Sequence, residues 1–113
     1  MTFDTKAIYW AHLEDTLKKA PETDWVPWYQ AAKYCQDQGI EPQKALAWIE
    51  KSLKAGDSFW NHETAARIYK DAKRMPEALA HLQKAIDLSK PGGAPKEYTD
   101  NLVKELAVWK GAK

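Results

Sequence analysis

The chain has 113 residues, with 17 lysine and arginine side chains against 16 aspartate and glutamate side chains. This length predicts a single domain that buries most of its apolar surface on folding. The net charge of +1 provides no strong field, so neither nucleic acid nor an anionic membrane is an expected partner.

The single cysteine, Cys35, cannot form a disulfide within the chain. No apolar run reaches the length of about 18 residues that a membrane helix needs. The first ten residues, MTFDTKAIYW, lack the basic start and the long apolar stretch of a signal peptide. We therefore expect a soluble chain without a signal peptide, whose localisation the sequence does not specify.

Six segments with apolar residues at helical spacing follow one another, separated by short turns. They span about residues 4–19, 25–38, 42–55, 59–73, 76–89 and 95–110. Asp24 is the expected N-cap of the second helix, Gly39 ends that helix, and Pro42 opens the third. Asp57 or Ser58 is the expected N-cap of the fourth. No alternating strand pattern occurs, so we predict an all-α fold of about six helices, antiparallel to their neighbours.

The stretches 28–53 and 62–86 share one pattern of small and large apolar residues, 33 or 34 positions apart. Ala31-Ala32 match Ala65-Ala66, Pro42 matches Pro76, Ala45-Leu46 match Ala78-Leu79, Ile49 matches Leu82, and Leu53 matches Ile86. The offset changes after the prolines because the first copy reads PQKAL where the second reads PEAL. Such a period is typical of helical repeat proteins.

The residues of each copy resemble the tetratricopeptide repeat. They are Trp28, Ala31-Ala32, Cys35, Gly39, Ala45, Ile49 and Leu53 in the first copy, and His62, Ala65-Ala66, Tyr69, Ala78, Leu82, Ala85 and Ile86 in the second. The resemblance implies an α-α superhelix of stacked helix hairpins in one domain, 1–113. It divides this domain into a half repeat (4–21), two repeats (24–56 and 58–90) and a closing helix (95–110).

Three further stretches, YQAAKYC, ALAWIEKSL and SFWN, are similar to the helical tail of a family of exported bacterial proteins of unknown function. In that family a β-rich domain precedes the helices. This domain has no counterpart among the 113 residues, which leaves open that the chain is an excised or engineered module.

Six tryptophans and five tyrosines are an unusual number for so short a chain. Trp28 and Tyr69 fall at repeat positions where bulky side chains wedge between paired helices, so we expect them in the core. Trp10, Trp48 and Trp109 lie beside other apolar positions at helical spacing and are also expected to be buried.

The tetratricopeptide resemblance implies a concave groove, into which Tyr29 and Trp60 would project. Lys33 and Gln36 occupy groove positions of the first repeat, and further polar residues occupy those of the second. We therefore predict a ligand-binding groove formed by Tyr29, Lys33, Gln36, Trp60, Glu63, Arg67 and Lys70. The alternative is that the aromatic rings pack on the first and last helices and that the charged residues form exposed intrahelical ion pairs, Lys33 with Asp37 and Arg67 with Asp71.

No catalytic residue, metal site or cofactor is predicted. His12, His62 and His81 fall on three different helices without the spacing of metal ligands, so we expect each at the surface or in the groove. Cys35 takes the place of a buried packing residue and is expected to be an inert thiol.

The predicted function is binding of a protein or peptide in the groove, by a monomer or a weak homo-oligomer. Tetratricopeptide proteins include carboxylate clamps for chaperone tails, but the asparagines of those clamps are not present, so a chaperone-tail receptor is not expected. One alternative is a small-molecule pocket or simple acid-base catalyst, natural or engineered, with His62 near Glu63 or Arg67. Another is a structural tail of a larger parent protein.

Overall fold

The computed structural model describes residues 5–21 and 23–111, and these contain six helices and no strand. The helices are α1 (Thr5–Lys19), α2 (Trp25–Gln38), α3 (Pro42–Ala55), α4 (Phe59–Asp71), α5 (Met75–Ser89) and α6 (Lys96–Gly111). The predicted all-α fold is therefore confirmed. Residue 4, the expected start of the first helix, lies outside the described residues. None of the helices that the structure describes is long and apolar enough to cross a bilayer.

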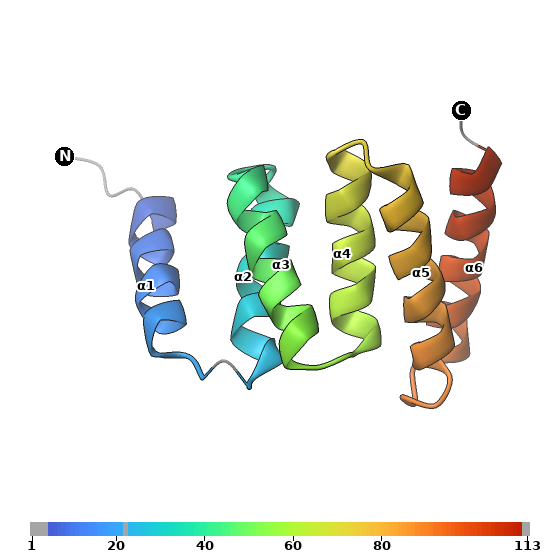
Figure 1. Ribbon diagram of the computed structural model, residues 1–113, viewed down its shortest axis with the longest axis horizontal. Coiled ribbons are helices and arrows are strands. Elements are labelled where there is room, and N and C mark those ends of the chain that lie inside the picture. The colour runs from blue at the N-terminus through green and yellow to red at the C-terminus, as the bar shows by residue number, and fades with distance from the viewer. Residues whose placement is uncertain (1–4, 22, 112–113) are drawn as a thin grey trace.

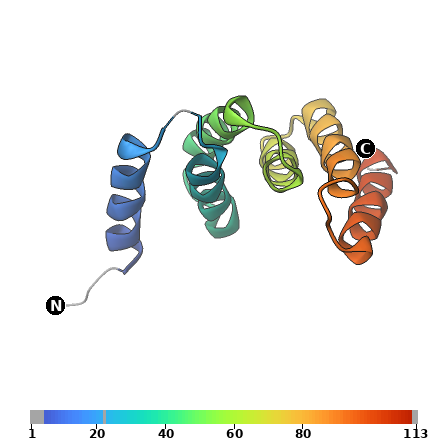
Figure 2. The ribbon, with the colours of Figure 1, turned by 90° about the horizontal axis from the view of Figure 1, so that it is seen from below.

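The helices follow one another along the long axis of the molecule, each running opposite to the next, and α2 lies behind α3 (Figure 1). Seen from below, the stack bends into an arc with α1 at one end and α6 at the other (Figure 2). Helix α2 packs on both α3 and α4, α4 packs on α5, and α5 packs on α6. Helix α4 is thus the centre of the stack and touches elements from both repeat copies.

Local side chains fix the helix ends largely where the sequence predicts them. The carboxylate of Asp24 accepts a hydrogen bond from the Val26 amide (3.0 Å), and Gly39 takes a left-handed conformation (φ 67°) after α2. Ser58, the second of the two expected caps, accepts a hydrogen bond from the Trp60 amide (3.1 Å).

Helix α4 ends at Asp71, two residues before the predicted end. Lys73 adopts a positive φ of 63°, the conformation that glycine usually supplies after a helix. The amide of Lys73 donates to the Lys70 carbonyl (2.9 Å) and that of Arg74 to the Tyr69 carbonyl (2.9 Å). This turn satisfies the last carbonyls of α4 and lets α5 begin at Met75.

The main core runs from α2 to α6, and small residues let its helices approach closely. Its buried members are Ala32, Cys35, Ala45, Ile49, Ala65, Ala66, Ile68, Tyr69, Ala78, Leu82, Ala85, Ile86, Leu102, Leu106 and Trp109. Three matched pairs of the two repeat copies are buried together in this core: Ala32 and Ala66, Ala45 and Ala78, and Ile49 and Leu82.

A smaller core joins α1 to the stack. Leu13 and Leu17 of α1 pack against Trp28 and Ala31 of α2. The half-buried rings of Trp10 and Trp48 lie beside this cluster, with centroids 5.4 Å apart. Trp28, Tyr69 and Trp109 are buried as predicted, whereas Trp10 and Trp48 are only partly covered.

Cys35 provides a test of the α2 register. Its side chain is 0% exposed, and burial raises the pKa of the thiol to about 11. Both effects suppress the reactive thiolate at neutral pH. We expect a thiol reagent to label the native protein at least about a hundredfold more slowly than the protein in denaturant. Labelling at equal rates in both conditions would place this face of α2 in solvent.

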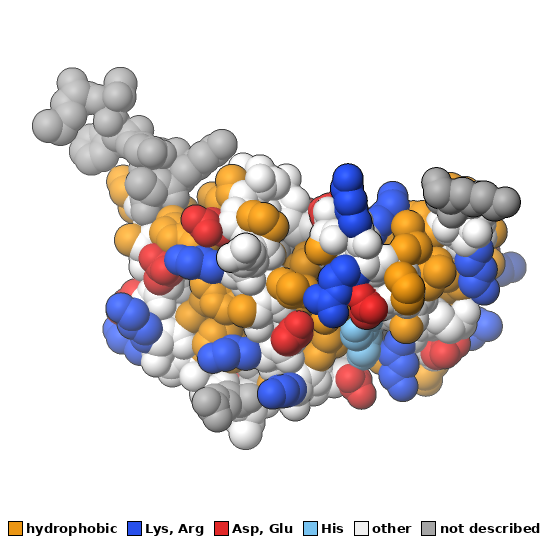
Figure 3. Space-filling view, turned by 45° about the horizontal axis from the view of Figure 1, so that its top comes forward, with side chains coloured by type: hydrophobic (Ala, Val, Ile, Leu, Met, Phe, Trp, Pro, Cys, Tyr) orange, Lys and Arg blue, Asp and Glu red, His pale blue; other side chains and the backbone are white. Residues whose placement is uncertain are grey.

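The surface mixes charges of both signs. On the face in Figure 3, lysine and arginine side chains alternate with aspartate and glutamate, and hydrophobic side chains appear between them. This distribution agrees with the near-neutral composition and shows no single-sign patch on that face.

Candidate binding groove

Helices α2, α4 and α6 enclose a hollow of about 300 Å³, which we call the groove pocket. Its lining residues are Tyr29, Lys33, Gln36 and Asp37 from α2, Trp60, Glu63, Thr64 and Arg67 from α4, and Tyr98 from α6. Their spacing of three, four or seven along each helix puts them on one face. The opposite faces of α2 and α4 carry the buried alanines, so core packing aims this face at the pocket.

Six of the seven predicted groove residues line this single pocket: Tyr29, Lys33, Gln36, Trp60, Glu63 and Arg67. The seventh, Lys70, does not line it. The Lys70 ammonium lies over the Trp109 ring, 4.9 Å from its centroid, where a cation–π contact holds it against α6. Tyr98 lines the pocket although the sequence analysis did not select it, since α6 lies outside the repeat that defined the groove positions.

Aromatic rings make up a large part of the pocket wall. Trp60 is 46% exposed, and its ring centroid lies 5.7 Å from that of Tyr98. Phe59 packs against both rings, with centroid separations of 4.6 and 5.3 Å. On the α2 side, Tyr29 is half-buried and meets the ring of Trp25 edge-on at 5.6 Å. These neighbouring rings restrict the wall to a narrow range of conformations.

Arg67 does not form the ion pair with Asp71 that the sequence suggested. Its guanidinium donates to Glu63 through Nε (3.1 Å) and Nη2 (2.9 Å). It also donates to both carboxylate oxygens of Glu105, at 2.9 and 3.2 Å. Glu105 reaches Arg67 from α6. Because Arg67 then donates hydrogen bonds to two carboxylates, an ion pair with the exposed Asp71, one helical turn away, is less favourable.

Lys33 and Asp37 form the predicted pair within α2, with Nζ and Oδ2 3.0 Å apart. Both side chains are about half exposed, so this contact contributes at most a few tenths of a kcal/mol. Unlike Arg67, Lys33 can leave its partner at little cost.

Tyr98 is linked to the charged cluster through its hydroxyl, which donates to Glu63 Oε1. Burial, followed by the hydrogen bond and the charge of Glu63, raises the pKa of the Tyr98 phenol far above its usual value. Burial likewise raises the pKa of Tyr29. Both phenols are therefore protonated at neutral pH.

A histidine pair lies between α4 and α5, away from the groove pocket. The Nδ1 atoms of His62 and His81 are 3.0 Å apart, and Nε2 of His62 lies 3.0 Å from Asp57 Oδ1. The expected surface position is correct for His12 but wrong for His62, which is 6% exposed. His62 fills the first position of its repeat, where the other copy has Trp28, and core packing there outweighs its polarity.

The geometry of this pair determines what chemistry is available there. His62 is turned toward α5 and is not among the residues that line the groove pocket, so it does not act beside Glu63 or Arg67. Within the described part of the chain, no group of three or more histidine, cysteine, aspartate or glutamate side chains is arranged to hold a metal ion.

The pair should make stability depend on pH. Burial and the neighbouring His62 lower the pKa of His81 below 6.5, outweighing Asp57 and Glu77, which act in the opposite direction. The folded state therefore binds fewer protons than the unfolded state, and stability falls as the pH drops below about 6.5. One such group changes the unfolding free energy by at most about 1.4 kcal/mol per pH unit.

We expect the wild-type chain to lose more stability than His81→Gln between about pH 7.5 and pH 5.5, measured by thermal melts at constant ionic strength. Glutamine can still donate to His62 but does not titrate. Identical pH profiles for the two proteins would contradict a titrating role for His81.

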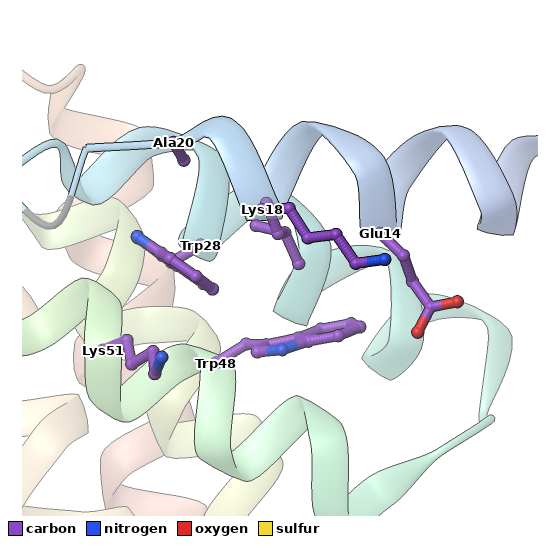
Figure 4. A pocket seen from close by; sticks show the side chains of 7 residues that line it. Glu14, Lys18, Ala20, Trp28, Trp48 and Lys51 are labelled. Atoms are coloured by element: carbon purple, nitrogen blue, oxygen red, sulfur yellow. The ribbon is translucent and has the colours of Figure 1, made fainter.

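A second hollow of about 440 Å³ lies where α1 meets α2 and α3. Its residues are Glu14, Leu17, Lys18, Ala20, Trp28, Trp48 and Lys51. Figure 4 shows the two indoles below α1, with Lys18 and Glu14 reaching down from that helix. The Lys51 ammonium covers the Trp28 ring at 4.6 Å, and Glu14 accepts a hydrogen bond from Lys44 (3.3 Å). Lys51 and Glu14 are engaged with these neighbours, and none of the predicted groove residues lines this hollow, so it is the weaker candidate.

Comparisons with protein-family models, with curated proteins and with solved structures found no match to this chain.

Proposed function

We propose that the protein is a peptide-binding module made of tetratricopeptide-like helix hairpins, with the groove pocket as its recognition site. The gathering of six groove residues around one aromatic-walled hollow is the observation that carries this proposal. These six residues come from the two copies of the repeat, three from each. They can share one pocket because α2 and α4 present equivalent faces to it.

The burial pattern supports the repeat assignment. Trp28 of α2 and His62 of α4 are equivalent and both are buried, as are Cys35 and Tyr69. Helix α6 packs on α5 and faces α4 across the pocket through Tyr98 and Glu105, where a third repeat would place its first helix. An extended peptide fits such a short groove through one or two anchoring side chains.

Trp60 is the residue to test, because it is the most exposed ring of the pocket wall. Arg67 is unsuitable, since its removal leaves Glu63 and Glu105 without their shared cation. In a screen of a random peptide library followed by calorimetry, we expect wild-type dissociation constants on the order of micromolar. Trp60→Ala should weaken binding by about tenfold or more, as for an aromatic hot spot.

Val108→Ala is the matched control, because Val108 is an exposed apolar residue of α6 that does not line the groove pocket. It should bind peptides as the wild type does. Both variants should unfold within about 1 kcal/mol of the wild type. A loss of several kcal/mol in Trp60→Ala would identify the ring as a core residue, and equal binding by all three proteins would place the peptide elsewhere.

A further inference from the structure

The charges of the cluster formed by Arg67, Glu63 and Glu105 at the wall of the groove pocket are not balanced. Arg67 is surrounded by two carboxylates, Glu63 and Glu105, and together these three groups carry one excess negative charge. Lys33 and Asp37 also line the pocket and neutralise each other. Glu105 does not itself line the pocket, but it binds Arg67, which does, so the charged cluster at the pocket wall has an excess of one negative charge.

Arg67 is poorly placed to receive a carboxylate from a ligand. Four of its N–H to oxygen contacts, between 2.9 and 3.2 Å, are already made with Glu63 and Glu105. An incoming carboxylate would have to displace one of these partners, which would remain beside it as a like charge. Only Lys33 could attract an anion, and Asp37 lies 3.0 Å from its ammonium.

The walls of the pocket favour the opposite sign. Trp60 and Tyr98 form two adjacent walls whose ring planes are tilted by 59°, and Tyr29 lines the pocket from α2. The faces of aromatic rings carry negative potential and attract cations, most strongly for tryptophan. The Tyr98 hydroxyl is bonded to Glu63, so this ring and a carboxylate meet at the same point of the pocket.

From this arrangement we propose that the groove pocket binds a cationic side chain of a peptide, the ammonium of lysine or the guanidinium of arginine, against Trp60, Tyr98 and Glu63. This inference rests on the proposed peptide-binding function and names the chemistry that the anchor must have. The cation would replace water next to the aromatic faces and neutralise the excess charge of the cluster.

The test compares three peptides that differ only at one central position, which is lysine, norleucine or glutamate in a glycine and serine background. Binding to the full chain is followed by tryptophan fluorescence and calorimetry at low salt. We expect the lysine peptide to bind about tenfold more tightly than the norleucine peptide, with the glutamate peptide weakest. Added salt should reduce this preference.

Glu105→Gln removes the excess charge while keeping a hydrogen-bond acceptor for Arg67. It should lower the preference for lysine over norleucine several-fold and should strengthen binding of the glutamate peptide. Asp100→Asn makes the same change in net charge on α6, but Asp100 is an exposed residue that is not part of the Arg67 cluster, so this variant should leave the preference unchanged. Equal losses in the two variants would mean that only the overall charge matters, which overturns the proposal.

Free choline and its uncharged isostere 3,3-dimethylbutanol separate this inference from the proposed function. Equal binding of the lysine and norleucine peptides, or preference for glutamate, overturns the cation site but leaves a peptide-binding groove. Binding of choline, but not of its isostere, with no binding of any peptide keeps the cation site and refutes the peptide module. Failure of all these probes to bind overturns both.

Discussion

Asn61→Ala is expected to lower the free energy of unfolding by about 3 kcal/mol, because it removes the polar centre of the α3–α4 turn. The Asn61 side chain is 0% exposed. Its amide nitrogen donates to the Gly56 carbonyl (2.7 Å) and to Ser52 Oγ (3.1 Å), and its oxygen accepts from the Ser58 amide (3.0 Å). Alanine removes hydrogen bonds from the buried Ser52 and from the partly buried Gly56 and Ser58, and it opens half of the capping box of α4.

Asn101→Ala provides the control, because Asn101 is an exposed asparagine on α6. Its replacement should change stability by less than about 0.5 kcal/mol. Chemical denaturation of both variants with the wild type measures the difference. A loss below about 1 kcal/mol in Asn61→Ala would mean that water replaces the lost hydrogen bonds and that the turn does not depend on this side chain.

Ala32→Leu and Ala66→Leu should each destabilise the protein by about 1–3 kcal/mol through overpacking. Both alanines are 0% exposed and occupy equivalent places in α2 and α4, where larger side chains of the paired helix leave no room. The repeat predicts effects of similar size at the two sites.

Ala47→Leu and Ala80→Leu are matched controls, since both alanines are exposed on α3 and α5. They introduce the same side chain at helical positions that face solvent and should be nearly neutral in denaturant melts. If the core and surface variants melted alike, the register of the two repeat copies would be wrong.

The sequence by itself determined the helices and the side of each helix that is buried. Asp24, Gly39 and Ser58 act on their own helix ends through contacts within a few residues, so their roles can be predicted without knowing the rest of the fold. The spacing of Ala31-Ala32 and Ala65-Ala66 similarly fixes one inner face for α2 and α4. The groove residues followed from the tetratricopeptide resemblance, which assigns the other face of these helices to the groove.

The partners across the groove were decided only by the tertiary structure. Tyr98 and Glu105 reach Glu63 and Arg67 from α6, 35 and 38 positions away in the chain. Which side chains of α6 meet α4 depends on how α6 rotates and slides on α5, and the repeat does not extend to that contact. A shift of one residue in that packing would turn Glu105 away from Arg67.

The contact between His62 and His81 also depends on how two helices pack. Each histidine taken alone is an unremarkable helical residue, and their ring contact depends on the separation of α4 and α5. The sequence therefore fixed local geometry and burial, which depend on neighbours along one helix. The net charge of the cluster around Arg67 depends on distances between helices, and only the packed stack sets those distances.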